Sequence, residues 1–381
     1  MVVLENLHLS KGWLDSSVCV GEPGFEQRET LENTLKTAAK SGFTHIVTQP
    51  DTPLGIETAK DTYIFSNQSL EQTQTPVTLH VCANLTTQKS QHKELTELYD
   101  LHQKGVRLFG DYKMSVQDPK LLQIALDYSD QFGGVIQSYP QDDRFASTGI
   151  VNESPNTLKL GIKGIPSISE ELQVQRDLTV LKYTNAGRLH FPTLSTTQST
   201  ELIKKAKQEG LSVSCSVTPH HLLLSDERLE DFKSVHLVLP PLRQKEDCIA
   251  LQQACKSQMI DMIASDHRPL TIEEKKVTLQ QATQGSIGME SCFGAIHKAV
   301  GLDTSIHLLT NGKNVFGIDN PSIMEGNKAD ITLFNPQTEY TFSSGDIVST
   351  QHNSIFLGEK LKGKAYGVYH QQKLLLNHPK N

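Results

Sequence analysis

The sequence predicts a mixed α/β protein built on a (β/α)8 barrel of the TIM type, with a small β-sandwich appendage. Short apolar runs rich in β-branched residues alternate with helical patterns, and eight such units follow one another along the chain. No G-x-G-x-x-G motif or P-loop supports the structural alternative, a doubly wound open sheet. After residue 318 the pattern changes to short β-like pieces separated by turn residues, which predicts the appendage.

The predicted barrel strands are short and evenly spread. They cover residues 14–20, 43–48, 77–83, 105–110, 134–138, 188–193, 211–217 and 259–265. Helical patterns lie between them, for example at 29–41, 118–132, 167–184 and 197–209. The longest irregular piece, 139–166, follows the fifth strand, where a barrel keeps its functional loops. We expect it to be either a lid or an interaction surface.

Composition excludes several classes of protein. Of the 381 residues, 37% are hydrophobic and 21% are charged, as in soluble globular proteins. A net charge of -7 gives no support to nucleic-acid or anionic-membrane partners. The start of the chain lacks the features of a signal peptide, and the six cysteines form no C-x-x-C pair. These features predict a cytoplasmic protein without nucleic-acid or membrane partners.

Polar residues stand where the predicted strands end, and a barrel places its active site there. Ser17 and Cys19 alternate with apolar positions, so that both side chains point to one face of the first strand. The other strand ends contribute Asp51, Asp111, Ser138, Thr193, Asp266 and His267.

Several stretches carry a family resemblance. They are EPGFEQRET (22–30), TPHHLLL (218–224), LPPLR (239–243), SDHRPL (265–270) and NPSIMEGNKADITLFNP (320–336). In this order they resemble the dihydroorotases of the amidohydrolase superfamily, the cyclic amide hydrolases of pyrimidine biosynthesis. The resemblance implies a metal-bearing barrel and a small β-sandwich built from both chain ends. Because the family carries a longer segment before its first barrel strand, we expect residues 1–13 to be a remnant of the small domain, 14–318 the barrel and 319–381 the rest of the sandwich.

The resemblance also implies which positions hold the metal and the substrate. The family's two metal-binding histidines of strand 1 correspond to Ser17 and Cys19, and its next arginine corresponds to Gly21. The remaining metal-ligand positions correspond to Asp111, Ser138, Thr193 and Asp266, and Asp266 alone is unchanged and is the candidate catalytic residue. The substrate-binding positions correspond to Asp51, which replaces an asparagine, and to His267.

These replacements predict a site without its metal. Catalytic zinc needs at least three protein ligands and an open position. Without the metal, the pKa of water stays near 15.7 instead of about 7, which costs on the order of 12 kcal/mol for making hydroxide. We therefore expect a dihydroorotase-like protein that binds no cofactor and is catalytically inactive. Its role would be structural or regulatory, with aspartate transcarbamoylase or a second copy as its partner, as the resemblance implies.

Two alternatives remain open at this point. The chain could be an active dihydroorotase, or a related cyclic amidohydrolase, that hydrolyses a cyclic amide C–N bond in a rebuilt site. That site would use Cys19, Asp111, Asp266 and His267, with zinc as the cofactor. The chain could also be a small-molecule binder without turnover, which ligand-induced thermal stabilisation would reveal.

Overall fold

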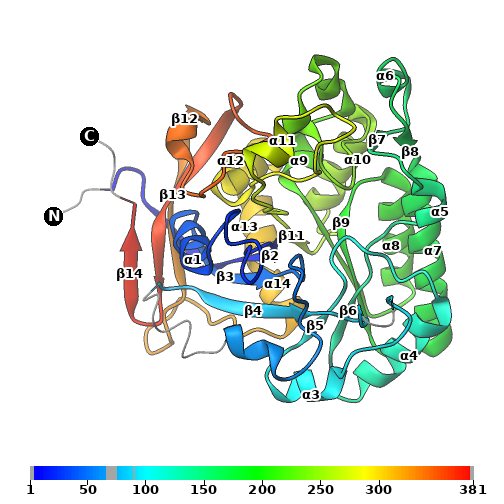
Figure 1. Ribbon diagram of the computed structural model, residues 1–381. Helices are drawn as coiled ribbons and strands as arrows, with labels where there is room; N and C mark the ends of the chain where they lie inside the picture. Colours follow the sequence, from blue (N-terminus) through cyan, green and yellow to red (C-terminus); the bar gives the residue numbers. More distant parts are fainter. Residues whose placement is uncertain (1–3, 66–74, 89–90, 378–381) are drawn as a thin grey trace.

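The computed structural model describes residues 4–65, 75–88 and 91–377, and its main feature is a parallel eight-stranded barrel (Figure 1). The strands lie in the order β11-β10-β9-β6-β5-β4-β3-β2, which confirms the predicted α/β barrel. The eight strands are β2 (Trp13–Val18), β3 (Phe43–Thr48), β4 (Thr78–Ala83), β5 (Leu108–Phe109), β6 (Val135–Gln137), β9 (Arg188–Leu194), β10 (Val213–Val217) and β11 (Met262–Ile263).

The barrel closes between its first strand and the segment that follows its last strand. Val18 pairs in parallel with His267. The backbone N–H of Cys19 donates to the carbonyl of His267 at 2.8 Å, and the N–H of His267 donates to the carbonyl of Ser17 at 3.3 Å. The two sequence segments with the most polar strand ends therefore lie side by side.

Helices connect the strands and cover the outside of the barrel (Figure 1). Three of them begin at threonine caps, since Thr30, Thr196 and Thr218 each accept a hydrogen bond from the backbone of the first turn. The helices are α1 (Leu31–Lys40), α3 (Leu98–Gln103), α4 (Pro119–Asp130), α5 (Asp143–Ala146), α6 (Pro155–Leu158), α7 (Ser167–Thr184), α8 (Thr197–Gln208), α9 (Pro219–Leu223), α10 (Lys245–Lys256), α11 (Ile272–Lys275), α12 (Met289–Val300), α13 (Leu302–Thr310) and α14 (Gly312–Phe316). Among the described residues, no helix is both long enough and apolar enough to cross a bilayer.

Both ends of the chain contribute to a second, antiparallel sheet at one side of the barrel (Figure 1). Its order is β1-β12-β13-β14, with β1 (His8–Lys11), β12 (Ile331–Thr341), β13 (Lys360–His370) and β14 (Lys373–Leu376). β1 pairs with β12 although more than 300 residues separate them. The strand that precedes the barrel in the sequence is thus an edge strand of the C-terminal sheet.

One tryptophan joins this sheet to the barrel. Trp13 is fully buried, and its ring contacts the rings of Phe43, Phe293 and Phe334 at centroid distances of 6.2, 4.7 and 5.5 Å. These residues come from β2, β3, α12 and β12, so the contact spans both parts of the molecule. In the part of the chain that the structure describes, the sheet packs on the barrel through this apolar cluster.

Segment 139–166 is more regular than the sequence predicted. It contains α5, α6 and a two-stranded parallel pair, β7 (Val151–Asn152) with β8 (Gly164–Ile165). Asn152 donates to Asp226 at 2.8 Å and accepts from Nη1 of Arg243 at 2.9 Å. The prediction of an irregular segment was wrong because contacts distant in sequence hold these short elements, namely these polar bonds and the packing of Val151 against Leu229, Leu237 and Leu279.

Candidate functional site

The residues predicted from the strand ends are all well covered, and most of them lie at the barrel mouth. Asp266 is the best-defined of them. It is 2% exposed, and its Oδ2 lies 2.7 Å from Nζ of Lys113 while its Oδ1 accepts from the hydroxyl of Tyr112 at 3.4 Å. Lys113 donates a further hydrogen bond to the carbonyl of Leu239. Burial raises the pKa of Asp266, and the ammonium of Lys113 opposes that shift. The retained carboxylate is therefore held by a cation of the same chain.

Three non-glycine residues at the mouth have left-handed backbone conformations. The φ angles are 55° for Tyr112, 53° for Thr193 and 52° for Asp266. Such angles are unfavourable for ordinary side chains, above all for the β-branched Thr193, and they persist only where the surroundings enforce them. The fold therefore holds the backbone of the mouth in a geometry that its own residues do not favour.

Cys19 contacts the same tyrosine but stays protonated. Its side chain is 3% exposed and interacts with the hydroxyl of Tyr112. Burial, together with the nearby carboxylate of Asp51, raises the pKa of the Cys19 thiol well above its ordinary value. Since the thiolate is the form that binds metals and attacks substrates, Cys19 is in its inert form at neutral pH.

Ser17, the neighbouring predicted position on the same strand, does not offer a strong metal ligand. Its backbone N–H donates to Oδ1 of Asp15 at 3.2 Å, and its carbonyl accepts from His267 in the barrel closure. The side chain is an uncharged hydroxyl on a buried residue. Imidazole, thiolate and carboxylate are the usual zinc ligands, so a serine hydroxyl is a poor replacement for a histidine.

Ser138 and Asp111, two further predicted positions, form hydrogen bonds with neighbouring elements and not with Asp266. Oγ of Ser138 donates to Asp177 of α7 at 2.6 Å. Asp111 accepts hydrogen bonds from the backbone N–H groups of Leu85 and Thr86 at 3.0 and 3.1 Å. Ser138 therefore anchors a helix, and Asp111 orders the loop that follows β4.

Thr193 is the family position with the least satisfied side chain. Its backbone N–H donates to Oγ of Ser216 at 3.3 Å. Its own Oγ1 is buried and, within the described residues, has no hydrogen-bond partner. Like Ser17, it offers a hydroxyl where the family resemblance implies a histidine.

The two predicted substrate-binding residues have structural partners. Asp51 receives a bidentate pair of hydrogen bonds from Arg268, Nε to Oδ2 at 3.1 Å and Nη2 to Oδ1 at 2.8 Å. Nδ1 of His267 accepts from the backbone N–H of Gly288 at 3.2 Å, at the start of α12. Burial lowers the pKa of His267, so its ring is neutral and positions α12.

Taken as a donor set, these residues do not fit the zinc ion that the resemblance implies. Asp266 is bonded to an ammonium, Cys19 is a protonated thiol, and Ser17 and Thr193 are hydroxyls. A catalytic zinc site needs three charged or imidazole ligands around one point. Each carboxylate at these strand ends already has partners: Asp266 has Lys113, Asp51 has Arg268, and Asp111 has the backbone N–H groups of Leu85 and Thr86.

The sequence prediction did not assign Tyr112 and Lys113 to the site, although both contact Asp266. They directly follow Asp111 at the end of β5, so their place at the mouth could be expected from the strand order. The direction of their side chains could not be expected from the sequence, because the positive φ of Tyr112 turns the chain and brings the ammonium of Lys113 to Asp266.

Comparison with known proteins supports a family assignment. The family described as "Dihydro-orotase-like" matches residues 8–199. The protein named dihydroorotase from Chlorobaculum tepidum is 31% identical over 392 residues, covering 97% of this chain and 87% of the relative. The dihydroorotase from Acetivibrio thermocellus is 34% identical over 363 residues, covering 93% and 84%.

Solved structures support the fold alone, because their sequences are distant. The L-hydantoinase (dihydropyrimidinase) from Arthrobacter aurescens superimposes with a TM-score of 0.80 at 18% identity, covering 97% of this chain and 85% of that one. A D-hydantoinase superimposes with a TM-score of 0.79 at 16% identity and the same coverage. The sequence relatives and the shared barrel together show that this chain belongs to the dihydroorotase-like family.

Proposed function

We propose that this protein is a non-catalytic member of the dihydroorotase-like family with a structural or regulatory role in cytoplasmic pyrimidine biosynthesis. The observation that carries the proposal is the ion pair of Lys113 with Asp266, at 2.7 Å. The one unchanged metal-ligand position of the family is bonded to an ammonium. A divalent cation at the same carboxylate would face that positive charge at close range.

The remaining residues of the mouth do not replace what a metal would supply. Hydrolysis of a cyclic amide needs an activated water and a group that stabilises the developing oxyanion. Two titratable residues at the family's ligand positions contact Tyr112, and of these Cys19 is a protonated thiol and Asp266 is bonded to Lys113. Asp266 is already bonded to an ammonium, and one carboxylate base does not make up a deficit on the order of 12 kcal/mol.

An active, rebuilt site is the second candidate, favoured by one observation. The hydroxyl of Tyr112 interacts with both Cys19 and Asp266, so two of the four residues invoked for that site do meet. The other two, Asp111 and His267, bond to the β4 loop and to α12. The protonated state of Cys19 counts against this candidate.

Turnover is the measurement that separates the two candidates. The purified chain is assayed with dihydroorotate in both directions, with zinc, manganese or cobalt added, beside the dihydroorotase from Chlorobaculum tepidum as the positive control. We expect no turnover above buffer. Metal-dependent turnover that disappears in Asp266→Asn would refute the proposal and support the rebuilt site.

The proposed role needs a partner, and we propose aspartate transcarbamoylase or a second copy of this chain. Exposed apolar side chains on loops that follow barrel strands support an interaction surface there. Leu54 is 64% exposed, Phe145 47% and Leu158 80%. Leu54 follows β3, and the other two lie in segment 139–166 after β6.

Size-exclusion chromatography with light scattering tests this surface. The chain is run alone and together with the aspartate transcarbamoylase of the same source. Leu158→Glu should weaken any complex, whereas Tyr183→Glu, 76% exposed on α7, should not. If the chain is a monomer that binds no transcarbamoylase, the partner proposal fails while the proposal of inactivity stands.

A further inference from the structure

A second cluster of ionisable side chains lies at the other end of the barrel. His45 is near the start of β3, Asp330 directly precedes β12, and His370 ends β13. Nε2 of His45 lies 3.3 Å from Oδ2 of Asp330, and Nδ1 of His370 lies 3.2 Å from Oδ1 of the same carboxylate. One ligand atom from each residue lies within 4.8 Å of the others. The cluster joins the barrel to the C-terminal sheet and is separate from Asp266.

Two atoms of this cluster lack partners. Within the described part of the chain, Oδ1 of Asp330 and Nδ1 of His370 are buried and make no hydrogen bond of acceptable geometry. The Asp330 side chain is 5% exposed and the His370 side chain 12%. A buried, unsatisfied polar atom costs about 1–3 kcal/mol, and such atoms often mark the place of an absent ion or water.

In both His45 and His370, the ring nitrogen that points away from Asp330 is hydrogen-bonded. Nδ1 of His45 lies 2.9 Å from Nε2 of His80, and Nε2 of His370 lies 2.8 Å from Oγ1 of Thr78. These bonds orient both rings so that their other nitrogens face Asp330. Metal-ligating histidines are usually held in this way, with the second ring nitrogen bonded to a neighbouring group.

We propose that His45, Asp330 and His370 form a binding site for a divalent transition-metal ion of the zinc type. Two imidazole nitrogens and a carboxylate are ligands that zinc accepts, with the remaining position open to water. Ligand distances of about 2.0–2.1 Å to zinc place tetrahedral ligands roughly 3.3 Å apart. Each imidazole nitrogen lies 3.2 or 3.3 Å from one of the two oxygens of Asp330, close to that spacing, while the full set of three ligand atoms spans up to 4.8 Å and would have to draw together around an ion.

Lys313 limits the affinity of this site. Its buried ammonium is bonded to Oδ2 of Asp330 at 2.5 Å and holds one side of the carboxylate. It would repel a cation at Oδ1. The two carboxylates differ, because both oxygens of Asp266 accept hydrogen bonds, whereas Oδ1 of Asp330 accepts none and lies beside an imidazole nitrogen. We therefore expect binding that is weaker than at a site without this ammonium.

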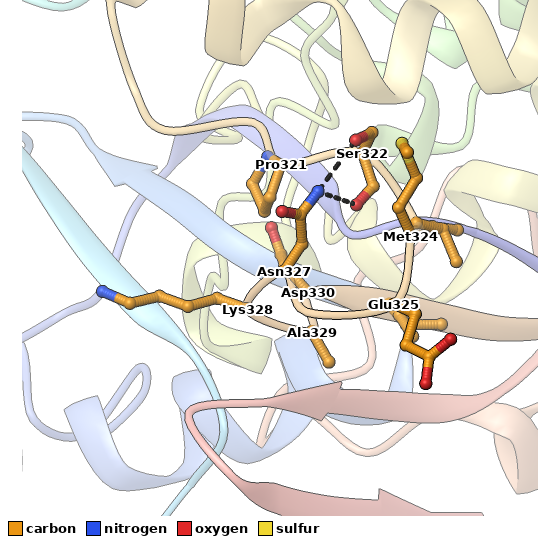
Figure 2. A pocket seen from close by; sticks show the side chains of 10 residues that line it. Pro321, Ser322, Met324, Glu325, Asn327, Lys328, Ala329 and Asp330 are labelled. Carbon is orange, nitrogen blue, oxygen red and sulfur yellow. Dashed lines mark hydrogen bonds between the residues drawn. The ribbon is translucent and has the colours of Figure 1, made fainter.

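A cavity leads to Asp330 (Figure 2). It has a volume of about 170 Å³ and is lined by residues between Pro321 and Ile331, with Asp330 among them. Nδ2 of Asn327 donates to the carbonyl and the hydroxyl of Ser322, at 3.1 and 2.9 Å, and closes the loop around it. Of the three proposed ligands, Asp330 is the one that lines this cavity.

Titration of the metal-free chain with zinc and cobalt tests the site. Competition with a chromophoric chelator gives the zinc affinity, and the visible absorption of bound cobalt reports nitrogen ligands and low coordination number. We expect one ion per chain. His45→Gln and His370→Gln should each lower the affinity at least tenfold, while His352→Gln, at an exposed histidine, should leave it unchanged.

A third variant covers the case in which the ligand variants do not fold. Thr78→Val keeps all three ligands and removes the hydrogen bond to Nε2 of His370, so it should weaken binding about tenfold. Asp266→Asn should leave the metal affinity unchanged, because Asp266 lies at the barrel mouth and not in this cluster. Failure of the unaltered chain to bind zinc or cobalt, or equal binding by all variants, would overturn the proposal.

Discussion

Nζ of Lys113 lies 2.7 Å from Oδ2 of Asp266, so the carboxylate that the family resemblance assigns to a metal is part of an internal ion pair. The two residues come from the ends of β5 and β11, on different sides of the barrel mouth. The pair therefore links strands across the mouth and replaces, with a lysine, the positive charge that the resemblance assigns to a metal.

Removal of the ammonium should destabilise the fold. Lys113→Met leaves the carboxylate of Asp266 buried without its counter-ion, and breaking a buried pair in this way costs about 3 kcal/mol or more. Urea unfolding at pH 7 measures the loss. The double variant Lys113→Met/Asp266→Asn should lose less than the sum of the two single variants. Additive losses would show that the two side chains do not interact.

Asp15 should make the stability depend on pH. Burial raises its pKa from 3.8 to about 7, while hydrogen bonds from Ser265 and Ser17 oppose that shift. Between about pH 4 and pH 7 the folded chain keeps a proton that the unfolded chain has lost, so the contribution of Asp15 becomes less favourable as the pH rises through this window.

Asp15→Asn removes this titration. The variant should gain free energy of unfolding relative to the unaltered chain, by about 2 kcal/mol more at pH 8 than at pH 5. Asp127→Asn, at an exposed position of α4, is the control and should show no such trend. A difference for Asp15→Asn that stays constant with pH would contradict the raised pKa.

Segment 139–166 should be ordered by one carboxylate. Asp226 accepts hydrogen bonds from Asn152, Ser154 and Asn156 at 2.8, 2.6 and 2.8 Å. Asp226→Ala should therefore speed amide hydrogen exchange in β7 and α6 by at least tenfold, whereas Glu227→Ala, next to it and exposed, should not. Unchanged exchange in Asp226→Ala would mean that other contacts hold the segment.

Two glycines that end helices should respond differently to alanine. Gly42 follows α1 with φ +94°, and a Cβ there would lie 2.7 Å from the ring of Trp13. Gly210 follows α8 with φ +82°, and its Cβ would meet nothing within 4 Å. Gly210→Ala should cost about 1 kcal/mol of backbone strain, and Gly42→Ala at least about 2 kcal/mol because overpacking is added.

The chain's single tryptophan is the probe for this comparison. Trp13 fluorescence should change in folded Gly42→Ala and stay unaltered in folded Gly210→Ala, because only the first alanine contacts the indole. Equal unfolding free energies for the two variants would show that the packing around Trp13 adjusts to the additional methyl group.

Local patterns predict the barrel well, because each strand is an apolar run and each helix has its own start and stop signals. The match of α7 to the predicted range 167–184 and of β3 to 43–48 shows this. Side-chain direction was less predictable. Ser138 lies at the expected strand end, but its hydroxyl donates a hydrogen bond to Asp177 of α7. The two residues are 39 positions apart, and no sequence pattern predicts this contact.

Contacts between ionisable side chains that lie far apart in the sequence were not predictable at all. Lys113 and Asp266 are 153 residues apart, and His45 and Asp330 are 285 residues apart. Neither pair belongs to a motif, and each forms only after the barrel closes. Residue identity led to the prediction that the family's metal ligands are lost, whereas the ion pair of Lys113 with Asp266 is visible only in the folded chain.

Steady-state turnover of dihydroorotate tests the central claim most directly. The metal-free chain is supplied with zinc, manganese or cobalt in turn and compared with the Chlorobaculum tepidum dihydroorotase under the same conditions. We predict no turnover above buffer with any of the ions, including under conditions in which one zinc ion per chain is bound through His45 and His370. Metal-dependent turnover that Asp266→Asn abolishes would contradict the account.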